Sequence, residues 1–420
     1  MYHKTLCITG SLLFLCGCSQ VQAIPEQHEE FYLQEIAHLH VEETIQEIPE
    51  DTQMKAIWIP MMLYESWMEG QSEDEFRTHV RNAFQNCADL GLNTVFLHAR
   101  AYCDAYYDSE LFPKGIYLTD DYDPLAIMIE EAHALNLNAH AWINPLRAMT
   151  PETLANLDES YLLRQWYDDP DKNGTYLVNH DGRYYLNPAY PEVRQLIADG
   201  AAEIIQNYPV DGIHIDDYFY PTTDPEFDSK AFSESSASDL AEWRRENISE
   251  MIQLLYQTVK DNNPEIPFSI SPQGNFTIDY DELYADVRLW ATEPGYCDIL
   301  IPQIYYGFEN QNLPFAETVE LWAETVTVPE LVIGLGTYKT GFADQWAGSG
   351  ENEFLNDSSV IPREIEFVFS QEDIDGIALY SYTSLFEPEQ EVAEIVHDEL
   401  AQIAELLHKN TAPEISGAES

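Results

Sequence analysis

Short apolar runs alternate with helical patterns along most of this chain, and that alternation limits the folds it can adopt. The apolar runs occupy residues 55–62, 93–100, 138–145, 210–215, 267–273, 297–305, 330–336 and 375–382. Helical spacing of apolar residues follows most of them, at residues 74–90, 124–135, 191–207, 238–262, 315–326, 362–369 and 388–408. Eight strand–helix units in succession predict a single (β/α)8 barrel, a TIM barrel of the α/β class.

An open, doubly wound sheet is the alternative fold for such an alternation. That fold needs a glycine-rich phosphate-binding turn after its first strand, and the sequence after residue 62 has none. The segment 149–187 is rich in Tyr, Asp and Asn and interrupts the pattern. We expect it to be a long loop over the barrel mouth, within one barrel domain that covers residues 53–409.

The first 17 residues are organised like a bacterial lipoprotein signal peptide. Two basic residues precede an apolar run, Leu6 to Leu15, that is too short to cross a bilayer. The run closes with Leu-Cys-Gly-Cys, so we expect cleavage before Cys18, acylation of the Cys18 thiol and anchoring in the cell envelope outside the cytoplasm. Cleavage near Ala23 as an ordinary secreted protein is the alternative.

Charge and composition indicate what the terminal segments are and which class of partner is excluded. Residues 18–52 are rich in Glu, Gln and His and are predicted to be an acidic tether, and residues 410–420 a polar tail. The chain has 19 Lys and Arg against 75 Asp and Glu, a formal charge of -56. Such a surface repels phosphate backbones, which excludes nucleic acid as a general partner.

Cysteine spacing indicates neither disulfides nor a metal. Six cysteines are present, but Cys7 and Cys16 lie within the signal peptide and Cys18 is the expected lipid anchor. The other three are odd in number and widely spaced, so they form no disulfide framework and no zinc motif. We expect no metal and no cofactor.

Two adjacent carboxylates at the end of the fourth apolar run are the main candidate for chemistry. Residues 211–217 read Asp-Gly-Ile-His-Ile-Asp-Asp, so the predicted strand ends in Asp216 and Asp217. Side-by-side carboxylates repel each other when partly buried, and their pKa values are driven apart, which yields one acid and one base. The alternative is a solvated turn with two helix-capping aspartates.

Active sites of (β/α)8 barrels lie at the C-terminal ends of the strands. His98 and Tyr338 are among the residues expected near those ends. From this set we select the following catalytic and substrate-binding candidates: Arg100, Asp104, Trp142, Asn144, Arg147, Asp216, Asp217, Tyr218, Tyr220, Gln273, Gln303, Tyr305 and Tyr382. Amides and hydroxyls bond sugar hydroxyls, and aromatic faces stack on sugar rings, so a glycan is the partner that this set favours.

The strand ends resemble those of the glycosyl-hydrolase-like 10 family of bacterial lipoproteins. The similarity rests on short motifs near residues 122–126, 140–145, 186–194, 210–221, 243–247, 270–272 and 302–305. It implies a barrel-type glycoside hydrolase that acts on peptidoglycan glycan strands already stripped of their peptides. This chain departs from the family pattern at His98, where the resemblance leads us to expect Gln.

A more distant resemblance suggests a mechanism. The fourth strand is similar to that of chitinases, but their catalytic Glu position is Tyr218 here. Adjacent carboxylates are similar to those of hexosaminidases that use the substrate acetamide as nucleophile, which are exceptions to the two-carboxylate scheme. The resemblance implies that Asp216 orients the acetamide and Asp217 is the general acid/base, and the reverse allocation stays open. Asp104 is the candidate for a distant partner carboxylate in a conventional glycosidase, or else a loop aspartate that binds a backbone amide.

Several other candidates have two interpretations. Arg100 and Arg147 could bind the lactyl carboxylate of muramic acid, or each could pair with a carboxylate at the mouth. Tyr305 and Tyr382 could contact the acetamide or the sugar ring, or fill the top of the barrel. His98, His140 and His214 are expected to form inward-facing layers rather than a metal site. A non-catalytic glycan-binding envelope lipoprotein is the alternative function.

Overall fold

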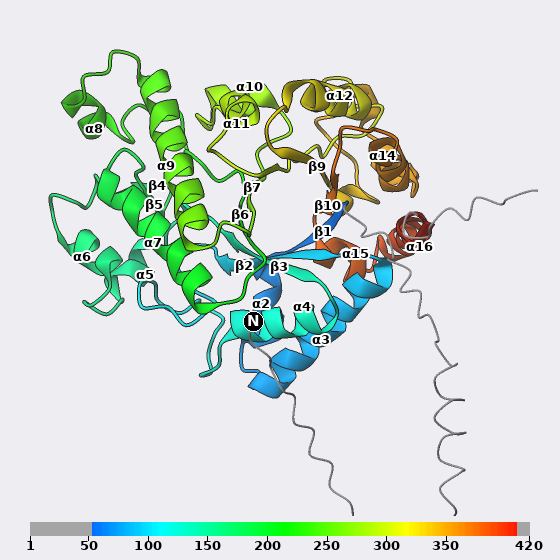
Figure 1. Ribbon diagram of the computed structural model, residues 1–420, viewed down its shortest axis with the longest axis horizontal. Helices are drawn as coiled ribbons and strands as arrows, with labels where there is room; N and C mark the ends of the chain where they lie inside the picture. The colour runs from blue at the N-terminus through cyan, green and yellow to red at the C-terminus, as the bar shows by residue number, and fades with distance from the viewer. Residues whose placement is uncertain (1–52, 410–420) are drawn as a thin grey trace, which may run out of the picture. The chain divides into compact units, whose positions relative to one another are not determined.

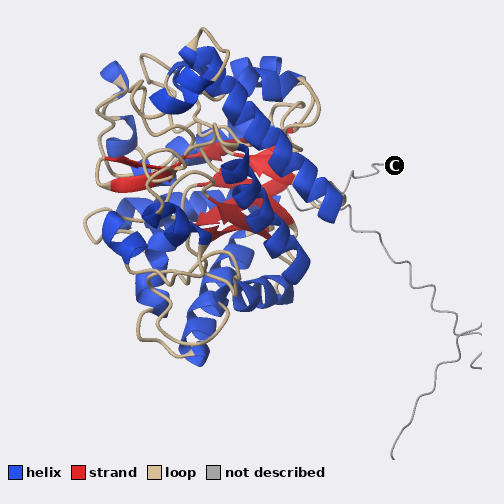
Figure 2. Cartoon of the chain, turned by 90° about the vertical axis from the view of Figure 1, so that its left-hand side faces the viewer, coloured by secondary structure: helices blue, strands red, loops and turns tan. Residues whose placement is uncertain are grey.

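The computed structural model describes residues 53–409, in which eight parallel strands close into a barrel surrounded by helices (Figures 1 and 2). Around the barrel the order is β1-β2-β3-β6-β7-β8-β9-β10, and β10 pairs with β1. The strands are β1 (Met54–Ile59), β2 (Thr94–Arg100), β3 (Asn138–Ile143), β6 (Gly212–Ile215), β7 (Phe268–Ile270), β8 (Ile299–Leu300), β9 (Glu330–Leu335) and β10 (Gly376–Leu379). The predicted (β/α)8 barrel is therefore confirmed.

Long helices cover the outside of the barrel near the predicted positions. They are α3 (Glu73–Leu90), α4 (Pro124–Ala134), α7 (Pro191–Asn207), α9 (Leu240–Asn262), α12 (Phe315–Thr325), α14 (Val360–Phe369) and α16 (Ala393–Lys409). Local chemistry sets their ends: Ser72 and Glu75 form a capping box at the start of α3, and Gly91 closes that helix at φ 90°.

Shorter helices occupy the connections between these elements. The connection after β7 holds α10 (Phe276–Asp281) and α11 (Val287–Thr292), where no helix was predicted. Outside segment 149–187, the others are η2 (Met61–Leu63), α2 (Tyr64–Met68), α8 (Ser229–Glu234), η3 (Thr337–Lys339), η4 (Gly348–Gly350), α13 (Glu353–Asn356) and α15 (Tyr382–Phe386).

Alternate residues of the strands fill the barrel interior. The inner apolar cluster consists of Ala56, Trp58, Phe96, Trp142, Ile299, Ile301, Val332 and Ala378. His140 and His214 are buried with it, as predicted, and burial keeps both imidazoles neutral by lowering their pKa values. His214 Nε2 accepts the indole N–H of Trp58 at 3.0 Å. Gly212 is required beside this layer, because a Cβ there would overlap the His140 ring.

The segment 149–187 differs from the predicted loop. It contains α5 (Pro151–Ala155), α6 (Leu162–Asp168) and a hairpin of β4 (Leu177–His180) and β5 (Arg183–Leu186). The hairpin turns at Asp181 and Gly182, both with positive φ, which is the turn chemistry that a tight hairpin requires. This Asp-Gly signal was readable in the sequence. The hairpin joins the end of the third unit through a bridge between Tyr185 and Arg147.

The signal peptide, the acylation of Cys18, the tether and the tail are predictions that concern residues outside the described part of the chain. Across residues 53–409, no helix is both long and apolar enough to span a bilayer. Cys87, Cys103 and Cys297 are buried free thiols.

Candidate active site

A cavity of about 340 Å³ opens at the C-terminal ends of the barrel strands and contains the aspartate pair. The predicted site residues that line it are Trp142, Arg147, Asp216, Asp217, Tyr218, Gln273, Gln303 and Tyr305. The other lining residues are Trp58, Met61, Met62, His98, Tyr102, Tyr338 and Tyr380. Carboxylates, amides, one guanidinium and aromatic rings thus surround a single space, a composition suited to a sugar.

The strand that carries the pair is anchored at its beginning. Asp211 accepts the backbone N–H of Ala139 at 2.7 Å and bonds the His133 imidazole at 2.8 Å, which ties β6 to the neighbouring unit. Asp216 continues the inward parity of His214 and is only 4% exposed. One of its oxygens accepts the Tyr218 backbone N–H at 3.3 Å. The sheet therefore holds Asp216 over the barrel axis.

Two amides from adjacent strands hold the second carboxylate. Gln303 Nε2 donates to Asp217 Oδ1 at 3.0 Å, and Gln273 Nε2 donates to Asp217 Oδ2. Both glutamines extend the sheet, because parallel bridges join Gln273 to Gln303 and Gln303 to Gly334. Behind them, Asp279 on α10 accepts the Gln273 backbone N–H at 3.1 Å. Amide donors on both oxygens favour the ionised form of Asp217.

The two carboxyl groups differ in their electrostatic surroundings. Burial, followed by the charge of Asp217, raises the pKa of Asp216 well above its usual range, and the Arg147 guanidinium acts in the opposite direction. Burial also raises the pKa of Asp217, but the amides of Gln303 and Gln273 oppose that rise. Two adjacent, poorly solvated carboxylates resist double ionisation, and the amide donors oppose protonation of Asp217 only, so a single shared proton is favoured on Asp216.

Arginine and tyrosine side chains alternate along one side of the cavity. The Arg147 guanidinium lies 4.0 Å from the ring centroid of Tyr218 and 4.6 Å from that of Tyr102, and its Nη2 donates to the Tyr102 hydroxyl at 3.1 Å. Arg183, from β5, lies 3.9 Å from the Tyr102 ring centroid. Neither arginine forms an ion pair with any carboxylate of the described part of the chain. Arg183 Nη1 also donates to the Ala148 carbonyl at 3.0 Å.

An aromatic layer forms the floor of the cavity. His98 and Trp142 stack with ring centroids 3.7 Å apart. His98 Nδ1 accepts the Met61 N–H at 3.3 Å, so Nε2 is the donor in its 2.9 Å bond to Asn144 Oδ1. Burial lowers the pKa of His98 to about 3, which makes it a neutral positioning group. On the opposite side, Tyr305 stacks on Tyr380 with centroids 5.9 Å apart.

Arg100 lies outside the cavity because the strand changes parity before it. A bulge between His98 and Arg100 shifts the β2–β3 register, so Arg100 points outward toward α7. There its guanidinium lies 4.4 Å from the Phe112 ring centroid and donates to the Ile197 carbonyl at 3.5 Å. Gly200 leaves the space that Arg100 occupies.

Asp104 and Asn144 shape the site from behind its lining. The Asp104 carboxylate is buried and accepts the backbone N–H groups of Ala101 and Tyr102 at 3.1 and 2.9 Å. Asp104 is therefore a loop aspartate that binds backbone amides, which was the alternative interpretation of this residue. Asn144 orients His98 and does not itself line the cavity.

Tyr220 and Tyr382 also lie outside the lining. Tyr220 is buried beside Tyr284 and the Arg244–Asp228 ion pair, which is 2.6 Å long and inaccessible to solvent. Tyr382 begins α15 and accepts the Asn86 amide at 3.0 Å on the outside of the barrel. Tyr380 takes the inward place at this strand end instead, in parity with Ala378.

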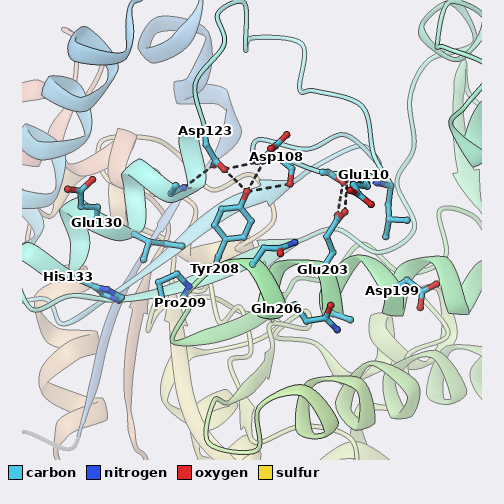
Figure 3. A pocket seen from close by; sticks show the side chains of 16 residues that line it. Asp108, Glu110, Asp123, Glu130, His133, Asp199, Glu203, Gln206, Tyr208 and Pro209 are labelled. Atoms are coloured by element: carbon cyan, nitrogen blue, oxygen red, sulfur yellow. Dashed lines mark hydrogen bonds between the residues drawn. The ribbon is translucent and has the colours of Figure 1, made fainter.

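A larger, acidic cavity of about 1310 Å³ lies between α4 and α7, away from the aspartate pair (Figure 3). Two of the carboxylates that line it accept hydrogen bonds from neighbouring residues. Asp123 accepts the Tyr208 hydroxyl, and Glu203 accepts the Ser109 hydroxyl at 2.6 Å and the Glu110 N–H at 2.7 Å. Among residues 53–409, no group of three His, Cys, Asp or Glu side chains is arranged to hold a metal ion.

Solved structures of low sequence identity share this fold. The glycoside hydrolase domain of PgaB (BpsB) from Bordetella bronchiseptica matches with a TM-score of 0.54 and 11% identity, over 86% of this chain and 99% of that domain. An alpha-amylase from Geobacillus thermoleovorans matches with a TM-score of 0.51 and 12% identity, over 86% of this chain and 79% of the amylase. Both similarities concern the fold alone.

Sequence relatives are more informative. The glycosyl hydrolase YngK of Bacillus subtilis is 31% identical over 364 residues, which are 77% of this chain and 69% of YngK. The glycosyl hydrolase DigH of Escherichia coli is 33% identical over 282 residues, 60% of this chain and 64% of DigH. Residues 53–348 match the family described as glycosyl hydrolase-like 10. The chain belongs to the glycosyl hydrolase-like 10 family, and its class of activity is glycoside hydrolysis.

Proposed function

We propose that this enzyme hydrolyses glycosidic bonds in N-acetylated cell-wall glycan, with peptide-free peptidoglycan strands as its substrate. The observation that carries the proposal is the adjacent pair of buried Asp216 and half-buried Asp217, the second of which accepts two amide hydrogen bonds within a cavity lined by aromatic rings. Binding a neutral sugar does not require two carboxylates side by side, whereas interacting carboxylates with separated pKa values can serve as an acid and a base.

The proposed mechanism uses the acetamide of the substrate as nucleophile. Its carbonyl oxygen attacks the anomeric carbon while the glycosidic C–O bond breaks, and a carboxylic acid protonates the leaving oxygen. Water then opens the cyclic oxazolinium ion, giving up a proton to the same carboxylate. The product keeps the anomeric configuration, because two displacements occur at that carbon.

Burial and hydrogen bonding favour the reverse of the allocation implied by the distant resemblance to hexosaminidases. Asp216 is the more deeply buried group and faces the charge of Asp217, so it holds the proton and serves as general acid. Asp217, held as a carboxylate by Gln273 and Gln303, accepts the acetamide N–H and stabilises the positive oxazolinium. This division of roles is part of the proposal.

The arginines support an anionic glycan. Arg147 lines the cavity, and the guanidinium groups of Arg147 and Arg183 both contact the ring of Tyr102. Neither arginine has a carboxylate partner among the described side chains. Muramic acid carries a lactyl carboxylate, and a guanidinium binds a carboxylate through two parallel hydrogen bonds. Local positive charge at the mouth also offsets repulsion of such a glycan by the acidic surface.

We further propose that the enzyme is an exported envelope lipoprotein, anchored through Cys18, which would place it next to that substrate. Cys18→Ala should move the protein from the membrane fraction to the soluble or uncleaved precursor pool. Continued partitioning of the variant as an acylated protein would contradict the anchor.

Incubation with peptide-free glycan strands, with products identified by mass spectrometry, tests the reaction itself. Asp216→Asn should slow cleavage of natural glycan by about 10²–10⁴-fold, and much less on an aryl glycoside whose leaving group needs no proton. Asp217→Asn should damage both reactions alike. The opposite pattern would return the acid role to Asp217.

The stereochemistry tests acetamide assistance separately. Retained configuration by NMR and inhibition by a thiazoline mimic are expected. Inversion would eliminate this mechanism and favour a conventional two-carboxylate glycosidase, for which Asp104 was the partner predicted from sequence; its buried, backbone-bonded position disfavours that role. Binding of glycan without any cleavage would favour the non-catalytic alternative.

A further inference from the structure

An exposed aromatic strip lies in the connection that follows strand β9 and precedes α14. It consists of Tyr338, Phe342 and Trp346, which are 44%, 37% and 85% exposed. Trp346 is the most exposed large apolar side chain in the described part of the protein. Because the three aromatic side chains border one cavity, they form a contiguous exposed apolar patch, and such patches are typical of binding surfaces.

The strip lines a shallow cavity that adjoins the active site. This second cavity, of about 480 Å³, is bordered by Tyr338, Phe342 and Trp346 together with Lys339, Ala343, Asp344 and Gln345. Tyr338 belongs to both cavities, since it also lines the space that contains the aspartate pair. Its ring meets Tyr305 edge-on at 5.7 Å between centroids, so the aromatic lining continues from one cavity to the next.

The backbone around Trp346 is firmly held although its side chain is exposed. The Trp346 N–H donates to Asp344 Oδ1 at 3.1 Å, and its carbonyl accepts the Asn312 amide at 3.1 Å. Asp344 is itself buried and paired with Lys339 at 2.6 Å. The loop therefore presents the indole on a rigid base, which lowers the entropy cost of binding.

We propose that Tyr338, Phe342 and Trp346 form an additional sugar subsite for the glycan strand that occupies the active site. The inference rests on the proposed function, because a polymeric substrate must continue beyond the cleaved bond. We take the glycan strand as the occupant because Tyr338 lines both cavities. A glycan that extends from the aspartate pair on this side therefore contacts the aromatic strip directly. The uncharged C–H faces of N-acetylated sugars stack on these rings, whereas the arginine side of the cavity takes their anionic substituents.

The test compares Trp346→Ala with the parent enzyme on glycan oligomers of increasing length and on a short aryl N-acetylglycoside. Loss of the subsite should lower kcat/KM on long oligomers by about tenfold more than on the short substrate, mainly through KM. Leu321→Ala is the matched control, because Leu321 is also exposed but lies on α12, outside both cavities. Trp346→Phe should recover much of the loss, since stacking requires a ring and not the indole nitrogen.

Binding provides a second measurement that needs no turnover. Long oligomers should change the tryptophan fluorescence of an Asp216→Asn variant, and that change should shrink when Trp346→Phe is added. Equal length dependence in the parent and Trp346→Ala would overturn the subsite while leaving the proposed function intact. A parent enzyme that neither binds nor cleaves these glycans would overturn both.

Discussion

Removing one amide donor from Asp217 should displace the pH profile of the enzyme in a predictable direction. In Gln303→Met the side chain keeps its length but loses the 3.0 Å hydrogen bond to Asp217 Oδ1. A hydrogen bond to a charged group contributes about 1.5–3 kcal/mol, and about 1.4 kcal/mol corresponds to a tenfold change in proton affinity. The amide stabilises the carboxylate form, so its loss raises the pKa of Asp217.

If Asp217 acts as a carboxylate, activity requires it to be deprotonated. The acidic limb of kcat/KM should then move up by roughly one to two pH units in Gln303→Met. An activated aryl N-acetylglycoside is the substrate of choice, because its leaving group makes the rate insensitive to the general acid.

Gln195→Met is the matched control. It removes an amide that donates to Asp199 on the exposed face of α7, far from the cavity. The control should keep the parent profile. An active Gln303→Met enzyme whose acidic limb stays in place, or moves to lower pH, would refute the view that Asp217 works as the ionised member of the pair.

Other predictions concern stability. The pKa of Asp216 is raised in the folded state, so the unfolded chain loses this proton first and the free energy of unfolding falls as the pH rises above about 4. Asp216→Asn removes this penalty. The variant should raise Tm by about 2 °C or more at pH 7, and by much less at pH 4. Glu399 on α16 accepts the Thr340 hydroxyl at 2.8 Å, and burial raises its pKa from 4.5 to about 8. The contribution of protonated Glu399 to the free energy of unfolding is therefore complete below pH 4.5 and is lost as the pH rises through about 8. In thermal melts over that pH range, the Tm of Glu399→Gln should fall less than the Tm of the parent. Salt should stabilise the protein, since 75 acidic against 19 basic residues repel one another; a Tm that falls between about 0.01 M and 1 M salt, where the Debye length drops from about 30 to 3 Å, would contradict this.

Strand periodicity explains which parts of the fold and site were predictable. Inward parity carries from His214 to Asp216, and from the ends of β7 and β8 to Gln273 and Gln303, so sequence alone brought these groups to one cavity. The bulge before Arg100 reverses that parity, and no residue in β2 signals a bulge.

Parity also fails where a strand gives way to another element. Tyr382 lies in the inward phase of the last apolar run, but α15 begins there and turns it outward. Tyr380 has the same phase and could have been selected by ending the strand earlier. Contacts made by loops, such as Tyr102 against Arg147 and Arg183, depend on tertiary packing that periodicity does not encode.

The bridges that join Gln273, Gln303 and Gly334 make the supports of Asp217 part of the barrel wall. Tyr102, Arg183 and Trp346, in contrast, belong to connections or to an inserted hairpin outside the barrel strands. The proposed function therefore assigns the reaction chemistry and the choice of glycan to separate parts of the molecule. Under that proposal, exchanging the hairpin or the loop after β9 offers a route to new polysaccharide preferences in which the aspartate pair keeps its geometry.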